Sequence, residues 1–324
     1  MSTLLAVISI YLFIFIGFIA KKVFQDDIHE KTLILISLYF LQPMLTFWGL
    51  TRTPINFNLV LTPFLYFIIV TIVLVILIFI GKYLFDEQKD RSIFIATSLI
   101  GNTGNLGIPL GIALFGESSV PYTSIINIAN IFFIYTVGIY FFAKSSFNFK
   151  ESLLQMVKIP ILWFALFALY FNYRGFSIHP QLDLILQMAA YATIVLQLII
   201  FGVYLAKTKI VLDNYKLSLS TSFVKLVFLP IVGMLVVLVS PLPNDIAAIL
   251  IISLVVPLAV NNVNIAALYD CKPYAVTAIV FLSTVLFLVY NYLIQFLFFN
   301  LFYRNIPKGI ATKSLLNSTN ISPL

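Results

Sequence analysis

The sequence GNTGNLGIPLGI, at residues 101–112, interrupts an otherwise apolar part of the chain and decides its fold. Its four glycines permit backbone angles that other residues avoid. Pro109 has no N–H group to donate, and it disfavours helical geometry at the residue before it. We therefore predict that a helix unwinds in this stretch and that Pro109 opens a second half-helix.

A second stretch of the same kind lies about 155 residues further along the chain. It reads VPLAVNNVNIA at residues 256–266, and it is also rich in asparagine and contains a proline, Pro257. The flanking segments correspond as well, Ser98–Ile100 to Ser253–Val255 and Ala113–Phe115 to Ala267–Tyr269. Together these correspondences at one offset indicate an internal repeat.

The composition excludes a soluble globular protein. Of 324 residues, 61% are hydrophobic and 10% are charged, whereas soluble domains have about 45–50% apolar and about 25% charged residues. The single cysteine, Cys271, excludes an intramolecular disulfide and a zinc cluster. The apolar N-terminus is followed by Lys21 and Lys22, which is typical of a retained first helix rather than of a cleaved signal peptide.

The apolar stretches are long enough to cross a membrane, which needs roughly 20 residues for a core of roughly 30 Å. Ten stretches qualify, namely 3–20, 31–50, 57–81, 92–115, 121–143, 155–173, 183–206, 217–239, 246–269 and 274–303. We therefore predict an all-α polytopic membrane protein with ten transmembrane helices. The predicted parts are a first five-helix repeat (1–143), a short cytoplasmic linker (144–154), a second five-helix repeat (155–303) and a C-terminal tail (304–324).

An odd number of helices in each half gives the two halves opposite orientations. Inverted repeats are typical of secondary transporters, whose binding sites lie at mid-membrane where broken helices meet. The broken helices here are the fourth and the ninth, and we expect them to cross at mid-membrane. Lipid-exposed unwound backbone is not tolerated at that depth, so the breaks must be buried in protein or line a wet cavity.

Positive charge is distributed unevenly among the loops. Twelve lysines and arginines flank the ends of helices one, three, five, seven and nine, whereas the opposite loops hold only Arg52 and Arg174. Cytoplasmic loops carry the excess of positive charge. We therefore predict an integral protein of the cytoplasmic (inner) membrane with its N-terminus outside. The basic tail, with Arg304, Lys308 and Lys313, would then also lie outside, against this trend.

Two broken helices that cross bring four half-helix ends together. Their N-terminal ends present free N–H groups and partial positive charge, which suit an anion such as a carboxylate. Neutral side chains around that point add donors and acceptors. An isolated asparagine in a membrane helix more often serves helix packing, but five in two related stretches favour a binding site. The candidate substrate-binding residues here are Asn102, Thr103, Asn105, Asn261 and Asn262.

At these residues the sequence resembles the auxin efflux carrier family, which includes plant auxin exporters and bacterial malate or malonate permeases. The motifs that carry the resemblance are YFLQPMLTFWGL (39–50), GNTGNLGIPLGIALFG (101–116) and VVPLAVNNVNIAALYD (255–270), followed by Ser283-Thr284. The resemblance implies a scaffold domain, elevator-type alternating access and a homodimer. It also adds Gln42, Gly107, Pro109 and Pro257 to the substrate region, with Pro43 nearby. The polar character of Asn105 and of the Asn261-Asn262 pair disfavours aromatic substrates.

The sequence does not determine which ion or gradient drives transport. Proton-coupled carriers usually bury an acidic residue within their helices, but here the acidic residues fall in loops or at helix ends. We predict no cofactor, and Na⁺ and H⁺ both remain candidate coupling ions. Lys225 is the charge furthest inside a predicted helix. It could attract an anion or replace a bound cation, but snorkelling to the cytoplasmic face is the favoured interpretation.

We predict a secondary active transporter of a small organic anion, a mono- or dicarboxylate. The alternatives are an exporter of auxin-like indole carboxylates and a membrane sensor that binds a ligand without flux. An enzyme is disfavoured because the sequence has no HExxH motif and no acidic metal-binding cluster at a membrane face. No catalytic and no metal-ligating residue is therefore predicted.

Overall fold

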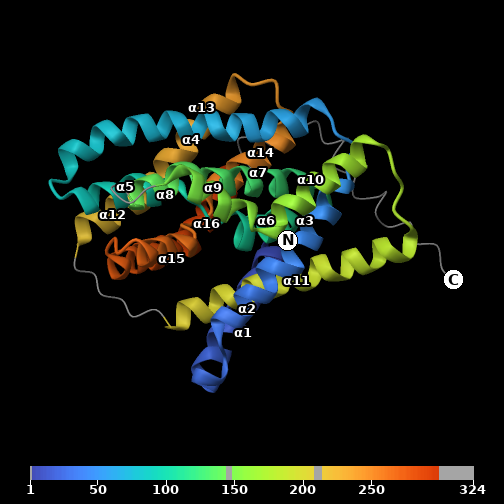
Figure 1. Cartoon of the computed structure of the whole chain (residues 1–324), viewed down its shortest axis with the longest axis horizontal. Helices are drawn as coiled ribbons and strands as arrows, with labels where there is room; N and C mark the ends of the chain where they lie inside the picture. Colours follow the sequence, from blue (N-terminus) through green and yellow to red (C-terminus); the bar gives the residue numbers. More distant parts are fainter. Residues whose placement is uncertain (1, 144–147, 208–213, 299–324) are drawn as a thin grey trace. The chain divides into compact units, whose positions relative to one another are not determined.

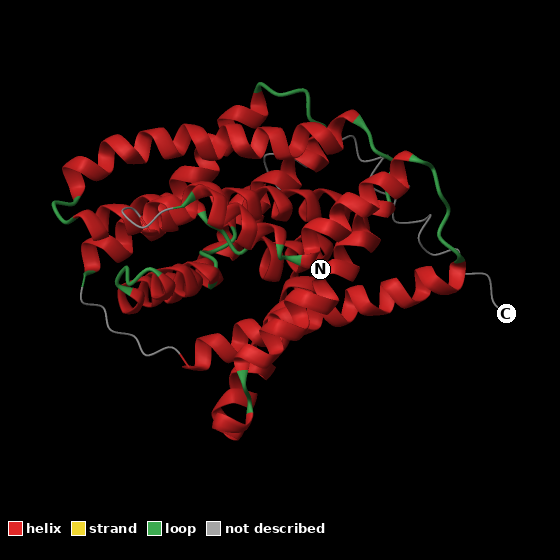
Figure 2. Ribbon diagram, in the orientation of Figure 1, coloured by secondary structure: helices red, strands yellow, loops and turns green. Residues whose placement is uncertain are grey.

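The computed structural model describes residues 2–143, 148–207 and 214–298, and within these ranges the regular elements are helices joined by short connections (Figure 2). The predicted C-terminal tail (304–324) and the last residues of the predicted tenth helix lie outside the described residues. The helices are α1 (Ser2–Phe24), α2 (Glu30–Ile36), α3 (Gln42–Thr51), α4 (Phe57–Leu84), α5 (Gln88–Leu99), α6 (Ile108–Phe115), α7 (Val120–Phe133), α8 (Ile139–Ala143), α9 (Phe149–Val157), α10 (Pro160–Tyr173), α11 (Pro180–Lys207), α12 (Tyr215–Phe223), α13 (Leu229–Leu238), α14 (Asn244–Val255), α15 (Asn261–Leu268) and α16 (Pro273–Phe298).

Several helical segments are long and apolar enough to cross a membrane. Five continuous segments of the described residues qualify, Glu30–Thr51, Phe57–Leu84, Glu117–Ala143, Pro180–Ala206 and Tyr215–Leu238. A sixth is formed if α9 and α10, which are bent by 66° at their break, are taken as one span. The first helix of this pair, α9, begins at Phe149, which lies inside the stretch predicted as a linker (144–154). The segments around the two asparagine-rich stretches are shorter apolar helices, as expected where a helix is broken.

Three helical segments contain a widened, π-helical turn that ends two residues before a proline. These turns are η2 (Ser37–Leu41) before Pro43, η3 (Thr103–Gly107) before Pro109 and η7 (Val224–Phe228) before Pro230. Proline lacks the N–H group that would close a normal turn, and its ring clashes with the carbonyl four residues earlier. Widening of the preceding turn relieves that clash, and π-helical turns of this kind are frequent at functional sites.

The helices of the compact unit that ends at Thr284 pack in two groups. In the first, here called the scaffold group, α1 packs along α11, and α3 packs against α10 and α11 (Figure 1). The backbones of α1 and α11 approach so closely that a Cβ atom at Gly202 would lie 1.9 Å from Ile14 O, and one at Gly17 would lie 2.1 Å from Ile199 O. Small residues permit such close helix packing in membrane proteins.

The second group, here called the junction group, comprises α4 to α8 and α12 to α15. Within it α4 packs against α5, α7 and α13, and α14 packs against α13 and α7. The two groups meet where α1 packs against α6 and where α3 packs against α7. A buried apolar cluster that includes Leu45, Trp48, Ile108 and Val120 fills this contact.

Candidate functional site

The two broken helices are joined to each other through their unwound backbones. α5 ends at Leu99 and α14 ends at Val255, and the segments that follow them pair as in an antiparallel β-ladder, with Gly101 opposite Leu258. Asn102 N donates to Pro257 O at 2.8 Å, and Ala259 N donates to Ile100 O at 3.0 Å. Each break thus satisfies backbone groups that the other leaves without a helical partner. We call residues 100–102 and 257–259 the junction.

Asparagine side chains satisfy further backbone groups at the junction. Asn130 of α7 donates from Nδ2 to Gly101 O at 2.9 Å, and Asn262 donates from Nδ2 to Ile100 O at 3.1 Å. Asn130 is itself held in place, because the Tyr66 hydroxyl donates to its Oδ1 at 2.9 Å. All these side chains are buried. Because unsatisfied buried polar groups are costly, this network stabilises the unwound backbone at Gly101.

The widened turn η3 is tied to both groups of helices. The Thr103 hydroxyl donates to Asn127 Oδ1 at 2.9 Å and accepts from Asn130 Nδ2 at 3.0 Å, so it is bound within the junction group. Asn105 accepts from Gln42 Nε2 at 3.1 Å, and this bond reaches across to the scaffold group. Two side chains of one short turn are therefore oriented by partners from α3 and α7.

A cavity of about 740 Å³ lies between the scaffold group and the junction group. Its size is in the range of pockets that hold small molecules. The junction and both asparagine-rich stretches form one wall, and α2, η2 and α11 contribute to the other. Its polar lining comprises Glu30, Ser37, Gln42, Asn102, Thr103, Asn105, Asn127, Asn130, Tyr135, Gln155, Tyr204, Asn261, Asn264, Tyr269, Tyr274 and Thr277.

Comparison with known proteins identifies the family to which the chain belongs. The family model described as "Membrane transport protein" matches residues 2–152 and 148–295. This chain belongs to that family of transporters. Because the family is that of the auxin efflux carriers, the resemblance seen in the sequence motifs is confirmed. An uncharacterized transporter of Methanocaldococcus jannaschii is 23% identical over 211 residues, which cover 62% of this chain and 68% of the relative. The chain is thus a membrane transporter, not an enzyme.

The structure brings five of the predicted substrate-binding residues of this transporter to the cavity and leaves four away from its lining. The five are Gln42, Asn102, Thr103, Asn105 and Asn261. Away from the lining lie Gly107, Pro109, Pro257 and Asn262. Three of these four contribute to the fold of the breaks, since Pro257 O accepts from Asn102 N, Asn262 Nδ2 donates to Ile100 O and Pro109 opens α6.

Asn127 and Asn130 of α7 line the cavity but were not predicted from the sequence. The signal for them is present in the sequence NIAN at residues 127–130. Two asparagines three positions apart lie on the same face of a helix, and a polar face in an apolar span indicates a partner inside the protein.

The predicted position of Lys225 is corrected by the structure. The sequence favoured a side chain that snorkels to the cytoplasmic face, but Lys225 in η7 is only 1% exposed. A Cβ atom built at Gly101 would lie 2.5 Å from Lys225 Nζ, so the ammonium group lies against the junction. The reason is that η7 packs against both α5 and α14, which directs the side chain inward.

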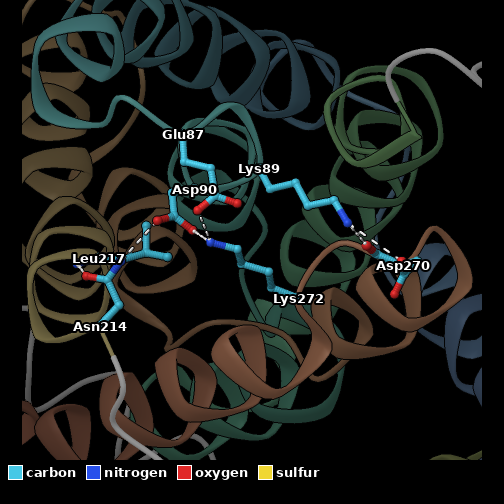
Figure 3. Close-up of polar contacts among 7 residues, drawn as sticks. All are labelled: Glu87, Lys89, Asp90, Asn214, Leu217, Asp270 and Lys272. Atoms are coloured by element: carbon cyan, nitrogen blue, oxygen red, sulfur yellow. Dashed lines mark hydrogen bonds and ion pairs between the residues drawn. The ribbon is translucent and has the colours of Figure 1, made fainter.

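Ion pairs tie the ends of several junction-group helices together outside the cavity (Figure 3). Lys272, between α15 and α16, donates to Asp90 Oδ1 at 2.7 Å and also contacts Glu87. Asp90 accepts in addition from Asn214 Nδ2 at 3.0 Å. Lys89 pairs with Asp270 at 3.6 Å. Partial burial lowers the pKa of Lys272, but its hydrogen bonds to Asp90 and Glu87 and their negative charges outweigh burial and raise that pKa above its usual value.

The lining of the cavity is thus amide-rich at the junction and contains unused hydrogen-bonding capacity there. Asn102 is 4% exposed, and its Nδ2 has no acceptor among the described residues. Among the residues that the structure describes, the cavity lining contains no lysine, arginine or histidine. Within the described part of the chain, no cluster of three or more His, Cys, Asp or Glu residues could hold a metal ion. Chemically, this end of the cavity offers hydrogen-bond donors to a small polar ligand.

Proposed function

We propose that this protein is a secondary active transporter of a small organic anion, a mono- or dicarboxylate, which binds at the junction of the broken helices. The observation that carries the proposal is the free Nδ2 donor of the buried Asn102, which lines the cavity beside the start of two half-helices. A buried donor without an acceptor is costly. A ligand with acceptor oxygens would satisfy it.

The electrostatics of the half-helices support an anion rather than a cation. The turn η3 begins at Thr103 and continues into α6, and α15 begins at Asn261. Both first residues line the cavity. The N-terminal ends of helices carry partial positive charge and free N–H groups, which favour carboxylates. Asn105 and Asn261 add neutral hydrogen-bonding groups, so several donors can surround one carboxylate.

The position of the cavity between two groups of helices supports alternating access. In the proposed cycle, the junction group moves past the scaffold group and carries the anion with it, as in an elevator. Glu117, at the start of the segment that contains α7, accepts a hydrogen bond from Tyr191 of α11. We propose that this contact between the two groups closes one side of the cavity and breaks when the protein opens to the other side.

We further propose that the ten predicted helices form two inverted repeats in the inner membrane, with the N-terminus outside. In this arrangement α1, α16, the bent pair α9–α10 and the shorter helices at the two breaks supply the crossings beyond the five long segments. In this topology Glu30, Gln155 and Tyr274 lie near the cytoplasmic ends of their helices, and all three line the cavity. The cavity would accordingly open toward the cytoplasm.

The test is flux through purified protein in proteoliposomes. Malate, malonate, lactate and indole-acetate would be offered with uncharged amides as controls, each with and without Na⁺ and a pH gradient. We expect saturable flux that is selective for carboxylates. Asn105→Ala and Asn261→Ala should abolish it, while Asn58→Ala, at an asparagine outside the cavity lining, should not. Wild-type flux in both cavity variants would refute the assignment of the site.

The same experiment separates the proposed function from its alternatives. A sensor would bind a carboxylate, measured by thermal stabilisation of the purified protein, and would give no flux. An exporter of auxin-like compounds would prefer indole-acetate to malate and lactate. Binding of the uncharged amides as tightly as of the acids would contradict an anion site.

A further inference from the structure

Lys225 is a basic residue buried against the junction, and packing alone does not explain its role. Its side chain is 1% exposed, within a span whose other buried residues are apolar or hydroxylated. Among the described residues no hydrogen bond or ion pair reaches its Nζ atom. A buried cation without a partner is strongly unfavourable, so a residue that served only packing would be better replaced by leucine or methionine.

The surroundings of the ammonium group are those of a cation site. A Cβ atom at Gly101 would lie 2.5 Å from Nζ and 3.1 Å from Cε, so Lys225 contacts the junction backbone from behind. α5 and α14 both end at the junction, at Leu99 and Val255. The C-terminal ends of helices carry partial negative charge that stabilises a cation. In transporters with broken helices, such ends and the unwound carbonyls beside them often coordinate the coupling ion.

The opposite face of the same backbone lines the cavity. Gly101 and Asn102 are part of the cavity wall, whereas Lys225 is not. The two helix N-termini at the junction and the two C-termini carry partial charges that roughly cancel, because each is about half an elementary charge. A protonated Lys225 would therefore give the junction a net positive charge, separated from the cavity by the backbone at Gly101.

Glu30 is the acidic residue of the cavity lining, and it does not neutralise this charge. It begins α2, while Gln42, which contacts Asn105, begins α3 twelve residues later. At a rise of about 1.5 Å per residue, the two positions are about 18 Å apart along the helix. Glu30 thus lies at the end of the cavity remote from the junction.

We propose that Lys225 is a positioning residue for the transported anion: its ammonium group occupies the place of a bound cation behind the junction and attracts the anion through the backbone at Gly101. This inference rests on the proposed function. It has two consequences. The affinity for the anion depends on the charge of residue 225 although that residue does not touch the ligand, and anion binding needs no Na⁺.

The charge of the ligand gives the sharpest test. Coulomb energy is proportional to ligand charge, so loss of the ammonium should weaken a dianion by the square of the factor that it costs a monoanion and should leave a neutral analogue unaffected. For a charge about 6 Å away at an effective dielectric constant of about 20, the factor for a monoanion is on the order of a hundredfold, and solvent in the cavity would reduce it toward about tenfold. A merely structural role would weaken all three ligands equally.

The experiment measures binding to purified protein by calorimetry in choline buffer and again with Na⁺. The probes are malonate, its monomethyl ester and malonamide, or the same three forms of whichever carboxylate in the transport panel binds best. The variants are Lys225→Met, which removes the charge at similar size, and Lys225→Arg, which retains it. Lys216→Met is the matched control, because Lys216 lies in the same helical segment and its Nζ donates to Leu84 O, away from the junction.

We expect Lys225→Met to lose affinity in the order dianion, monoanion, neutral amide, while Lys225→Arg and Lys216→Met retain the order and most of the affinity of the wild type. Na⁺ should not change wild-type affinity. Equal losses for all three ligands, no loss, or a requirement for Na⁺ in the wild type would each overturn the inference and leave the transporter proposal intact. If no carboxylate binds the wild type, the proposed function fails, and the inference fails with it.

A second variant covers the case in which Lys225→Met does not fold. Gly101→Ala retains the lysine but displaces its ammonium group, because the added methyl group would lie 2.5 Å from Nζ. It should show the same charge-dependent loss at a smaller magnitude. If Gly101→Ala changes the affinity for all three ligands by the same factor, and Lys225→Met does not fold, the role of Lys225 is structural and the inference is overturned.

Discussion

Asn130→Leu should destabilise the protein more than any other single change at the junction, because this asparagine makes three buried hydrogen bonds. Its Nδ2 donates to Gly101 O at 2.9 Å and to Thr103 Oγ1 at 3.0 Å, and its Oδ1 accepts from the Tyr66 hydroxyl at 2.9 Å. Leucine has nearly the same volume and no polar atom, so all three partners lose a bond without a large cavity.

The magnitude follows from the number of bonds. A side-chain hydrogen bond between membrane helices contributes about 0.6 kcal/mol on average and about 1.7 kcal/mol at most. Loss of the three bonds of Asn130 should therefore lower the free energy of unfolding by about 2–5 kcal/mol. Tyr66→Phe removes a single bond of the same network and should cost about a third as much. Asn58→Leu, whose side chain makes no such bond, should change stability by less than about 0.5 kcal/mol.

Unfolding in mixed micelles of dodecylmaltoside and sodium dodecyl sulfate, followed by tryptophan fluorescence and far-ultraviolet circular dichroism, measures these differences. The reasoning predicts a graded series, with Asn58→Leu closest to the wild type, then Tyr66→Phe, then Asn130→Leu. If Asn130→Leu is no less stable than Tyr66→Phe, the network does not hold the unwound backbone. The junction would then owe its stability to the two backbone hydrogen bonds between the breaks.

Three further substitutions test other parts of the structure. Gly202→Leu should prevent stable folding or separate α1 from α11, because even a Cβ atom there would lie 1.9 Å from Ile14 O, and cross-linking between cysteines placed on the two helices would measure it. Asp90→Asn should lower stability by about 1–3 kcal/mol, because it leaves Lys272 without its closest carboxylate. Because the pKa of Lys272 is raised in the folded protein, this stabilisation is complete below the ordinary lysine pKa of 10.5 and is lost as the pH rises above it. Denaturation at a series of pH values should therefore show that the free energies of unfolding of the wild type and of Asp90→Asn become equal only in strong alkali. Glu117→Ala removes the acceptor of the Tyr191 hydroxyl and should raise the initial rate of flux if opening limits the cycle, whereas an unchanged rate would show that this contact is no gate.

The breaks could be predicted from the sequence because their cause is local. Glycine and proline act on the backbone at their own positions, so the stretch around Pro109 and the stretch after Pro257 could each be predicted to unwind without knowledge of any neighbour. The pairing of the two breaks is not local. It became predictable only because the second stretch repeats the first at a fixed offset, which places both at the same depth.

The direction of individual side chains could not be predicted in this way. Asn261 and Asn262 are adjacent, and consecutive residues of a helix point about 100° apart. The structure turns Asn261 toward the cavity and Asn262 toward Ile100 O. The prediction that the Lys225 side chain reaches the cytoplasmic face was wrong for the same reason. The hydropathy of a segment indicates the depth of a residue in the membrane but not the side of the helix on which the residue lies. That side depends on which helices pack around η7.

The chemistry of the junction also suits the two opposing demands of a carrier, which must bind its ligand and then release it. An arginine in the cavity would hold a carboxylate by a bidentate pair whose loss on release leaves a buried, unpaired charge. At the junction the groups that face the cavity are neutral amides, a hydroxyl and helix termini, and the bonds of Thr103 to Asn127 and of Asn102 N to Pro257 O lie within the junction group and are made without a ligand. The proposed charge, on Lys225, lies behind the backbone at Gly101, near the C-terminal ends of α5 and α14. Separation of charge from contact would let the site attract an anion at long range and still release it at low cost.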